Sequence, residues 1–164
     1  MGINGFIIMG VSGCGKSTVA RILAEGLGWE FFDADNFHPP ENIAKMESGI
    51  PLSDSDRAPW LSALNEMLIS TLKAGRHPVL ACSALRERYR KTLCQGTDGL
   101  QFVYLKGRYD LIWSRISQRE EHYMKPEMLR SQFEALEEPV DALVMDVRLT
   151  PEETVETIIK TFQH

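Results

Sequence analysis

The stretch "GVSGCGKS", residues 10–17, decides the fold of this 164-residue chain. Gly10, Gly15, Lys16 and Ser17 satisfy the pattern G-x-x-x-x-G-K-[ST] in full. The stretch follows the apolar run "GFIIMG" and opens a predicted helix, which is the context that makes the pattern a P-loop. Glycines let the chain bend so that several backbone N–H groups point inward at a helix N-terminus, whose dipole also favours an anion. The sequence therefore predicts a nucleotide-binding loop.

Each part of this loop has an expected task. Lys16 should reach the β- and γ-phosphates, and the Ser17 hydroxyl should bind Mg2+. The alternative interpretation is a glycine-rich turn before an ordinary exposed lysine. Cys14 is interpreted as a small residue that fills space, with a redox role as its alternative. The predicted nucleotide-binding residues are Gly10, Val11, Ser12, Gly13, Cys14, Gly15, Lys16, Ser17 and Thr18.

Composition narrows the class of protein. Apolar residues make up 43% and charged residues 25%, which is typical of a globular protein, and the length favours one domain over residues 1–164. The net charge of −5 gives no general attraction to nucleic acid or to an anionic membrane. The apolar runs are far shorter than the roughly 20 residues of a membrane span. Three cysteines without paired metal spacing suit a reducing cytoplasm and argue against zinc.

Five apolar runs are predicted to be strands, at residues 5–10, 29–35, 77–84, 101–107 and 141–147. Segments of helical length separate them. Continuous apolarity indicates strands covered on both faces, and alternation of strand and helix indicates a parallel sheet. The predicted fold class is a three-layer α/β domain.

Two helices have further support in the sequence. The run "SDSD" at 53–56 is suited to cap a predicted helix that carries Trp60, Leu61, Leu64 and Leu68 on one face. The last helix is predicted to have Thr150 as N-cap, Pro151 first and Glu153 closing a capping box. Its buried stripe consists of Val155, Ile158, Ile159 and Phe162.

The run "FFDADNFHPP" at 31–40 places two aspartates at the end of the second predicted strand. Alternate strand residues share a face, so Asp33 and Asp35 should point the same way, about 6 to 7 Å apart, towards the γ-phosphate. Asp33 is assigned to Mg2+, and Asp35 to orienting an acceptor hydroxyl and accepting its proton. Alternatively, both aspartates cap the following turn and helix. His38 either contacts substrate or pins a turn.

Several segments resemble the signatures of the small P-loop gluconokinases, which are similar in fold to shikimate kinase. They are "DADNFHPPENIAKMESGIPLSDSDRAPWL" (33–61), "ACSALRERYR" (81–90), "REEHYM" (119–124) and "SQFEALEEP" (131–139). With the P-loop, the resemblance runs from about residue 5 to residue 146.

The resemblance implies ATP-dependent phosphorylation of D-gluconate on its primary hydroxyl, giving 6-phosphogluconate. It also implies a cytoplasmic homodimer, a five-stranded parallel sheet in the order 2-3-1-4-5, and a mobile lid at about residues 117–126. By position, Asp35 is the acceptor-binding aspartate and candidate base, and Asp33 lies on the metal side. Arg57 is expected near the carboxylate of the acid substrate, and Arg119 of the lid closes on the phosphates.

Local chemistry leaves alternatives for the other polar residues. Arg57 suits a carboxylate because of its planar fork, or it forms an ion pair with Asp54 or Asp56. Arg86 and Arg90, four apart on a predicted helix, either serve the substrate or form a solvated basic face.

Ser83 either offers its hydroxyl to the substrate or begins the helix that carries Arg86 and Arg90. The role of Lys45 is open. Asp146 is interpreted as a structural residue or as one that flanks the base of the nucleotide. The predicted substrate-binding residues are Asp35, His38, Arg57, Ser83 and Arg86.

Three positions depart from the usual pattern of the family. Ala34 separates the aspartates where glycine is more usual, and Cys14 stands where serine is more usual; both changes should be tolerated. Glu121 replaces a glycine before the lid histidine, and an added carboxylate there should affect closure over phosphates.

The predicted reaction is direct in-line transfer without a phosphoenzyme. Lys16, Mg2+ and Arg119 stabilise the moving phosphoryl group, and Asp35 positions the hydroxyl. One rival is a kinase for another small hydroxy acid or for shikimate. The other is a nucleotide-binding regulator that has lost catalysis.

Overall fold

A five-stranded parallel sheet forms the centre of the computed structural model, which describes residues 2–118 and 125–162. The strands are β1 (Gly5–Met9), β2 (Glu30–Asp33), β3 (Pro78–Ala81), β4 (Leu100–Lys106) and β5 (Leu143–Asp146). Their order is β2-β3-β1-β4-β5, and every neighbouring pair is parallel. Ile7 of β1 lies opposite Leu80 of β3 and Phe102 of β4. The predicted fold class and strand order are confirmed.

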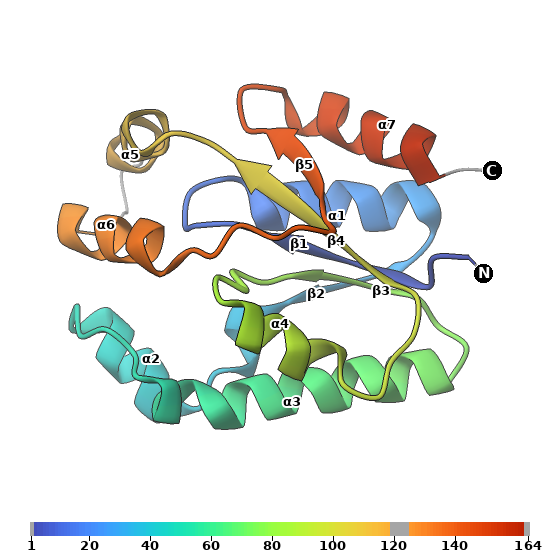
Figure 1. Ribbon diagram of the computed structural model, residues 1–164, viewed down its shortest axis with the longest axis horizontal. Coiled ribbons are helices and arrows are strands. Elements are labelled where there is room, and N and C mark those ends of the chain that lie inside the picture. The colour runs from blue at the N-terminus through green and yellow to red at the C-terminus, as the bar shows by residue number, and fades with distance from the viewer. Residues whose placement is uncertain (1, 119–124, 163–164) are drawn as a thin grey trace.

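Helices cover both faces of this sheet, with α1 and α7 on one side and α3 and α4 on the other (Figure 1). Each strand is followed by at least one helix, as parallel pairing requires. Among residues 2–118 and 125–162, no helix combines the length and apolarity needed to cross a membrane. The helices are α1 (Lys16–Leu27), the 3-10 helix η1 (Ala34–Phe37), α2 (Pro40–Glu47), α3 (Asp54–Lys73), α4 (Glu87–Cys94), α5 (Tyr109–Ser117), α6 (Pro126–Ala135) and α7 (Pro151–Phe162).

Two hydrophobic clusters lie on opposite faces of the sheet. Ile8 belongs to the cluster under α1 and α7, with Leu23 and Ile158. Its neighbour Ile7 belongs to the cluster over α3 and α4, with Leu64 and others. Successive side chains of a strand point to opposite faces, so both must be apolar when both faces are covered. This burial explains why β1 reads as an uninterrupted apolar run.

Both predicted helix starts are confirmed by reciprocal hydrogen bonds. At α3, the Asp56 N–H donates to Ser53 Oγ at 3.1 Å, and the Ser53 N–H donates to Asp56 Oδ2 at 2.9 Å. At α7, Thr150 and Glu153 make the same pair of bonds at 3.1 and 3.0 Å. These capping boxes satisfy N–H groups that have no partner inside the helix.

Candidate active site

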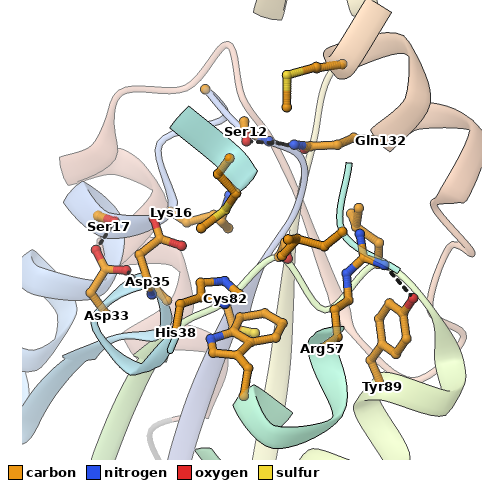
Figure 2. A pocket seen from close by; sticks show the side chains of 18 of the residues that line it. Ser12, Lys16, Ser17, Asp33, Asp35, His38, Arg57, Cys82, Tyr89 and Gln132 are labelled. Carbon is orange, nitrogen blue, oxygen red and sulfur yellow. Dashed lines mark hydrogen bonds between the residues drawn. The ribbon is translucent and has the colours of Figure 1, made fainter. Parts of the chain in front are cut away.

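A cavity of about 470 Å³ opens where β1, β2 and β3 end, and the P-loop forms one wall (Figure 2). The loop follows β1, Asp33 ends β2, and Ser83 follows β3. Ligands bind at this edge of open α/β sheets because the carboxyl ends of the strands meet there. The predicted site residues that line the cavity are Ser12, Gly13, Gly15, Lys16, Ser17, Thr18, Asp33, Asp35, His38, Arg57 and Ser83.

The P-loop adopts a conformation that depends on glycine. Gly15 has φ 95° and is the N-cap of α1, so the loop turns directly into a helix N-terminus. Gly13 has φ 81°, and a Cβ there would lie 2.5 Å from Ile116 Cγ1. Lys16 Nζ donates to the Val11 carbonyl oxygen at 3.0 Å, across the loop. The loop is therefore built as an anion cradle with its lysine folded over it.

Cys14 fills space behind this cradle. Its side chain is buried, and that burial raises the pKa of the thiol. A buried thiol with a raised pKa is a poor nucleophile, which favours the packing interpretation over a redox role.

Asp33 connects the P-loop helix to the turn that follows β2. Its Oδ2 accepts from the Ser17 hydroxyl at 2.9 Å, and its Oδ1 accepts from the Asp35 N–H at 3.0 Å. The second bond makes Asp33 the N-cap of η1. The capping alternative is thus confirmed for Asp33, although the residue also lines the cavity.

The strand geometry expected for the aspartate pair is wrong. The strand β2 ends at Asp33, and Asp35 lies in η1, because the Asp33 side chain caps the chain into a 3-10 turn. Even so, both carboxylates line the same cavity as Lys16. Turn geometry brings them there, whereas we expected strand alternation to do so.

The carboxyl group of Asp35 has a raised pKa. Burial is the main cause, and the negative charge of Asp33 adds to it, while Lys16 opposes the shift. A carboxylate that is partly desolvated holds a proton more readily. Asp35 is therefore a better proton acceptor than an ordinary exposed aspartate.

His38 lines the cavity and packs against the turn that follows β2, whereas its contact with substrate stays a prediction. Its ring stacks on Trp60 with centroids 4.2 Å apart, and the Trp60 indole N–H donates to the Ala34 carbonyl at 2.7 Å. Asn42 Nδ2 lies 3.1 Å from His38 Nδ1. Burial first and the Arg57 cation second lower the pKa of His38 to about 4. The ring is therefore neutral near pH 7, and Nδ1 accepts from the amide, which leaves the proton on Nε2.

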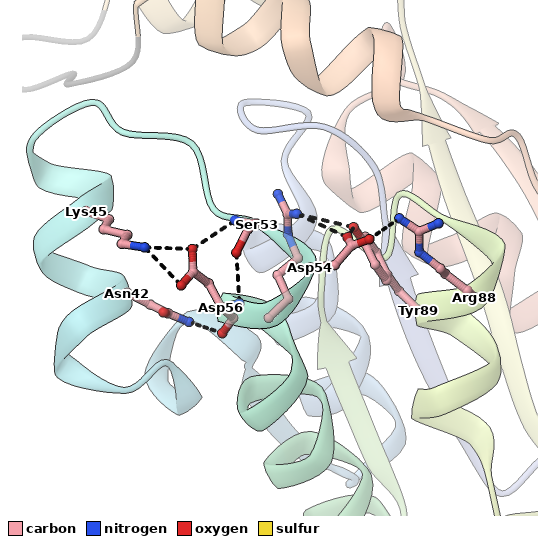
Figure 3. A network of polar contacts seen from close by, with 8 residues as sticks. Asn42, Lys45, Ser53, Asp54, Asp56, Arg88 and Tyr89 are labelled. Atoms are coloured by element: carbon pink, nitrogen blue, oxygen red, sulfur yellow. Dashed lines mark hydrogen bonds and ion pairs between the residues drawn. The ribbon is translucent and has the colours of Figure 1, made fainter.

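Arg57 lines the cavity and is held by Tyr89, a residue that sequence reasoning missed (Figure 2). Arg57 Nη1 donates to the Tyr89 hydroxyl at 3.2 Å, and that hydroxyl donates to Asp54 Oδ1 at 2.6 Å. Arg88 also bonds Asp54 (Figure 3). Arg57 lies 3.9 Å from Asp54 Oδ1, so the ion-pair alternative is present in a long form. The tyrosine stands in "ACSALRERYR", but nothing in its spacing revealed this contact.

Asp56 is engaged elsewhere and does not pair with Arg57. Lys45 Nζ binds both of its carboxylate oxygens, at 2.9 and 3.0 Å (Figure 3). The Ser53 backbone N–H first, and Lys45 second, hold the pKa of Asp56 at about 2. Lys45 is not among the residues that line the cavity and instead ties α2 to the start of α3.

The two arginines after β3 do not share a helical face, which corrects that expectation. Arg86 is the N-cap of α4 and has extended backbone, so only Arg90 lies within the helix. Arg90 is buried and donates to the carbonyl oxygens of Ala84 at 2.6 Å and Glu137 at 2.8 Å. A solvated basic face is therefore wrong for Arg90. Arg86 lines neither cavity described here, and its substrate role stays a prediction.

A second cavity, of about 310 Å³, lies on the other side of the P-loop. Gly13 and Gly15 line both cavities, whereas Cys14 lines only the second, together with Arg115 and Arg148. Asp146 holds Arg148 through bonds of 2.7 to 3.1 Å at the end of β5. This contact agrees with a structural role for Asp146 beside that cavity.

Gln132 of α6 is another cavity residue that sequence reasoning missed. Its side chain makes two hydrogen bonds to Ser12 of the P-loop, 120 residues away in the sequence (Figure 2). The segment "SQFEALEEP" contains it, but only the tertiary structure brings α6 to the loop.

Ser17 and Asp33 fit a magnesium ion that arrives with phosphate. Both present oxygen atoms, which Mg2+ prefers, and they already lie within hydrogen-bonding distance. In the described part of the chain, no three His, Cys, Asp or Glu side chains form a metal cluster. Mg2+ commonly needs only one or two protein ligands because phosphate and water supply the rest. Arg119 and Glu121 of the predicted lid lie outside the described residues.

The parallel sheet, the P-loop after its first strand and the carboxylates facing that loop define a P-loop kinase of small molecules. The sequence pattern of the family described as "Shikimate kinase" matches residues 12–163, and the chain belongs to that family.

Within this family the chain belongs to the gluconokinases. It is 43% identical to the thermoresistant gluconokinase of Escherichia coli strain K12, over 96% of this chain and 93% of that protein. It is 46% identical to a probable gluconokinase of Mus musculus, over 81% of this chain and 82% of that protein. The crystal structure of a gluconokinase from Sinorhizobium meliloti 1021 superposes with a TM-score of 0.87 at 40% identity, over 99% of this chain and 93% of that one.

Proposed function

We propose that this chain transfers the γ-phosphate of ATP to the primary hydroxyl of D-gluconate, giving 6-phospho-D-gluconate and ADP. One observation carries the proposal: Asp35 and Arg57 line the same cavity as Lys16 of the P-loop. A carboxylate, a guanidinium and a phosphate-binding lysine are the groups needed for an acceptor that has both a hydroxyl and an acid group. The gluconokinase relatives support the same substrate.

The nucleotide is assigned to both sides of the P-loop. Its phosphates lie in the cradle formed by residues 10–18, and its base and ribose lie in the second cavity. Arg115 and Arg148 line that cavity and offer positive charge and planar guanidinium groups. The P-loop borders both cavities, so a phosphate chain that starts in the second cavity ends in the first.

Gluconate is assigned to the first cavity, with its carboxylate on Arg57. The Tyr89 hydroxyl and ring hold the guanidinium in place, at 3.2 Å from Nη1 and 5.5 Å from the ring centroid to Cζ. His38, with its proton on Nε2, supplies a neutral donor to a hydroxyl of the acceptor, and Ser83 supplies a further hydroxyl. A neutral donor suits a polyol because hydroxyl oxygens carry no charge to be balanced.

Asp35 is the residue proposed to take the proton. As the oxygen of the acceptor hydroxyl bonds to the γ-phosphorus, the bond from that phosphorus to the β–γ bridging oxygen breaks. The hydroxyl proton passes to the Asp35 carboxylate, whose raised pKa favours its acceptance. Lys16 lies against the phosphate that is transferred, and Arg119 is proposed to approach it from the lid. Mg2+, when bound by Ser17 and Asp33, neutralises phosphate charge.

A coupled assay of ADP release tests this function. Purified protein with ATP and Mg2+ is offered D-gluconate, other aldonates, shikimate or no acceptor. We expect gluconate to give the highest kcat/KM, with product phosphorylated on the primary hydroxyl by phosphorus NMR. A preference for shikimate or for another hydroxy acid would replace the proposed acceptor. Binding of ATP without turnover of any acceptor would instead indicate a regulator.

The remaining proposals rest on the family. We propose that residues 1–164 act as one kinase domain, that two copies form a homodimer, and that the enzyme works in the cytoplasm. The continuous five-stranded sheet supports the first of these. Light scattering of the purified protein measures the second, and cell fractionation with an activity assay measures the third.

A further inference from the structure

The carboxamide of Gln132 binds Ser12 of the P-loop at two points (Figure 2). Gln132 Oε1 accepts from the Ser12 backbone N–H at 2.7 Å. Gln132 Nε2 approaches the Ser12 hydroxyl oxygen at 2.9 Å and donates to it. Each end of the carboxamide thus meets a complementary group, and the contact orients the side chain as a unit. We call this pair of bonds the Gln132 clasp.

The clasp is presented by an anchored helix. Leu129, one turn before Gln132, is fully buried in the core cluster under α1 and α7. At the start of α6 the Tyr109 hydroxyl donates to the Pro126 carbonyl at 3.2 Å, and beyond its end the Glu137 N–H donates to the Leu85 carbonyl at 2.7 Å. These contacts fix α6 in place, so the helix holds Gln132 against the P-loop.

Ser12 lies on the acceptor side of the P-loop. It lines the first cavity with Asp35 and Arg57, whereas Cys14, two residues on, lines only the second cavity. Transfer to an acceptor in the first cavity requires the terminal phosphate to be the one nearest Asp35. Its place in the acceptor cavity favours the terminal phosphate as the partner of the Ser12 N–H, and the inner phosphates as partners of the amides farther along the loop.

An amide carbonyl is a neutral substitute for a phosphate oxygen. Both accept a hydrogen bond from a backbone N–H, and a phosphate oxygen makes the stronger bond because it is charged. Lys16 is engaged in a similar way, because its ammonium donates to the Val11 carbonyl oxygen within the loop. These two donors, which the P-loop offers to phosphate, thus have partners within the protein.

We propose that Gln132 is a positioning residue that occupies the Ser12 N–H until the terminal phosphate of a triphosphate displaces it. ATP must break the clasp, whereas ADP, which lacks that phosphate, leaves it closed. The clasp therefore lowers the affinity for ATP selectively and re-forms after transfer, when only ADP remains. This inference rests on the proposed function in taking ATP as the nucleotide.

Two substitutions at Gln132 test the proposal by equilibrium binding. Gln132→Met keeps the length of the side chain and removes both hydrogen bonds, and Gln132→Glu places a stronger, charged acceptor at the same N–H. Calorimetry in the presence of Mg2+ and without acceptor measures the dissociation constants of the protein for ADP and for a non-hydrolysable ATP analogue. Gln95→Met is the matched control, because Gln95 is exposed after α4 and lines neither cavity.

The ratio of the two dissociation constants is the decisive quantity. Gln132→Met should tighten binding of the analogue relative to ADP by about three- to tenfold, the scale of one net hydrogen bond. Gln132→Glu should weaken the analogue relative to ADP, and Gln95→Met should leave the ratio unchanged. A purely structural role would shift both nucleotides equally.

Two results would overturn the clasp. One is an equal change for ADP and the analogue in both variants, and the other is selective loss of the analogue in Gln132→Met, which would mean that Gln132 itself binds the terminal phosphate. These outcomes are distinguishable from failure of the proposed function, because gluconate-dependent ADP release by the wild-type protein is measured separately. If Gln132→Met does not fold, Gln132→Glu is measured alone. Weaker binding of the analogue relative to ADP then supports the clasp, and an equal change for both nucleotides overturns it.

Discussion

The hydroxyl of Ser17 donates to Asp33 Oδ2 at 2.9 Å, which links the first turn of α1 to the end of β2. The other oxygen of the same carboxylate caps η1 through the Asp35 N–H. One side chain thus joins the phosphate-binding loop to the turn that carries the candidate base. This carboxylate therefore bridges the P-loop helix and the η1 turn.

Asp33→Asn should weaken metal binding while preserving the turn. Asparagine keeps a carbonyl oxygen to accept from the Asp35 N–H but loses the negative charge that attracts Mg2+. We expect the Mg2+ concentration for half-maximal activity to rise about tenfold or more. Titration of the activity with Mg2+ at constant ATP measures this concentration. An unchanged melting temperature is the control for an intact fold. An unaltered Mg2+ requirement would leave Asp33 as a cap alone.

Asp35→Asn should lower kcat by about 100-fold or more while ATP affinity stays within a few-fold of wild type. The amide cannot accept the hydroxyl proton, although it occupies the same place in η1. Steady-state kinetics give kcat, and calorimetry with an ATP analogue gives the affinity. Near-normal turnover in this variant would remove Asp35 from the mechanism.

Arg57→Met should raise the KM for gluconate with little change in the KM for ATP. The guanidinium lines the acceptor cavity, and methionine retains much of its apolar stem. Tyr89→Phe should have a smaller effect in the same direction, because it removes the 3.2 Å bond to Arg57 but keeps the ring. Kinetics with each substrate varied in turn test both variants. A raised KM for ATP in Arg57→Met would assign Arg57 to the nucleotide.

His38 should remain neutral down to about pH 4, the pKa to which burial and Arg57 lower it. Because the folded pKa lies below the unfolded value of 6.5, the unfolded state binds more protons between these pH values. The contribution of His38 to stability therefore rises with pH through that window and falls on acidification. NMR titration of the imidazole measures the pKa, with His38→Gln identifying the signal. In Arg57→Met the pKa should move upward, and a value unaffected by this change would exclude the Arg57 charge as a cause.

Arg90→Met should destabilise the fold without altering the substrate KM values of the folded enzyme. Removing the guanidinium leaves the Ala84 and Glu137 carbonyls without their donor, which costs about 1 to 3 kcal/mol. Urea denaturation measures the loss. Lys91→Met, on the exposed side of α4, is the matched control and should change stability little. A selective rise in the gluconate KM would show that Arg90 serves the acceptor after all.

The sequence alone determined the features that depend on local pattern. The P-loop motif, the five apolar runs, the cap of α3 and the capping box of α7 each involve residues close together in the chain, so spacing and residue type were enough to predict them. Resemblance to the gluconokinases supplied the strand order, which the sheet confirms. Asp33, Asp35, His38 and Arg57 were all predicted, and all line one cavity.

Only the tertiary structure decided how these residues are held. Asp35 enters the site from a 3-10 turn because the Asp33 carboxylate caps its N–H, and strand periodicity cannot show where a strand ends. Tyr89 positions Arg57, and Gln132 binds Ser12, across 32 and 120 residues. Such contacts depend on which helix faces meet after the sheet forms. The same packing buried Arg90, whose charge and position in the sequence are typical of an exposed helix surface.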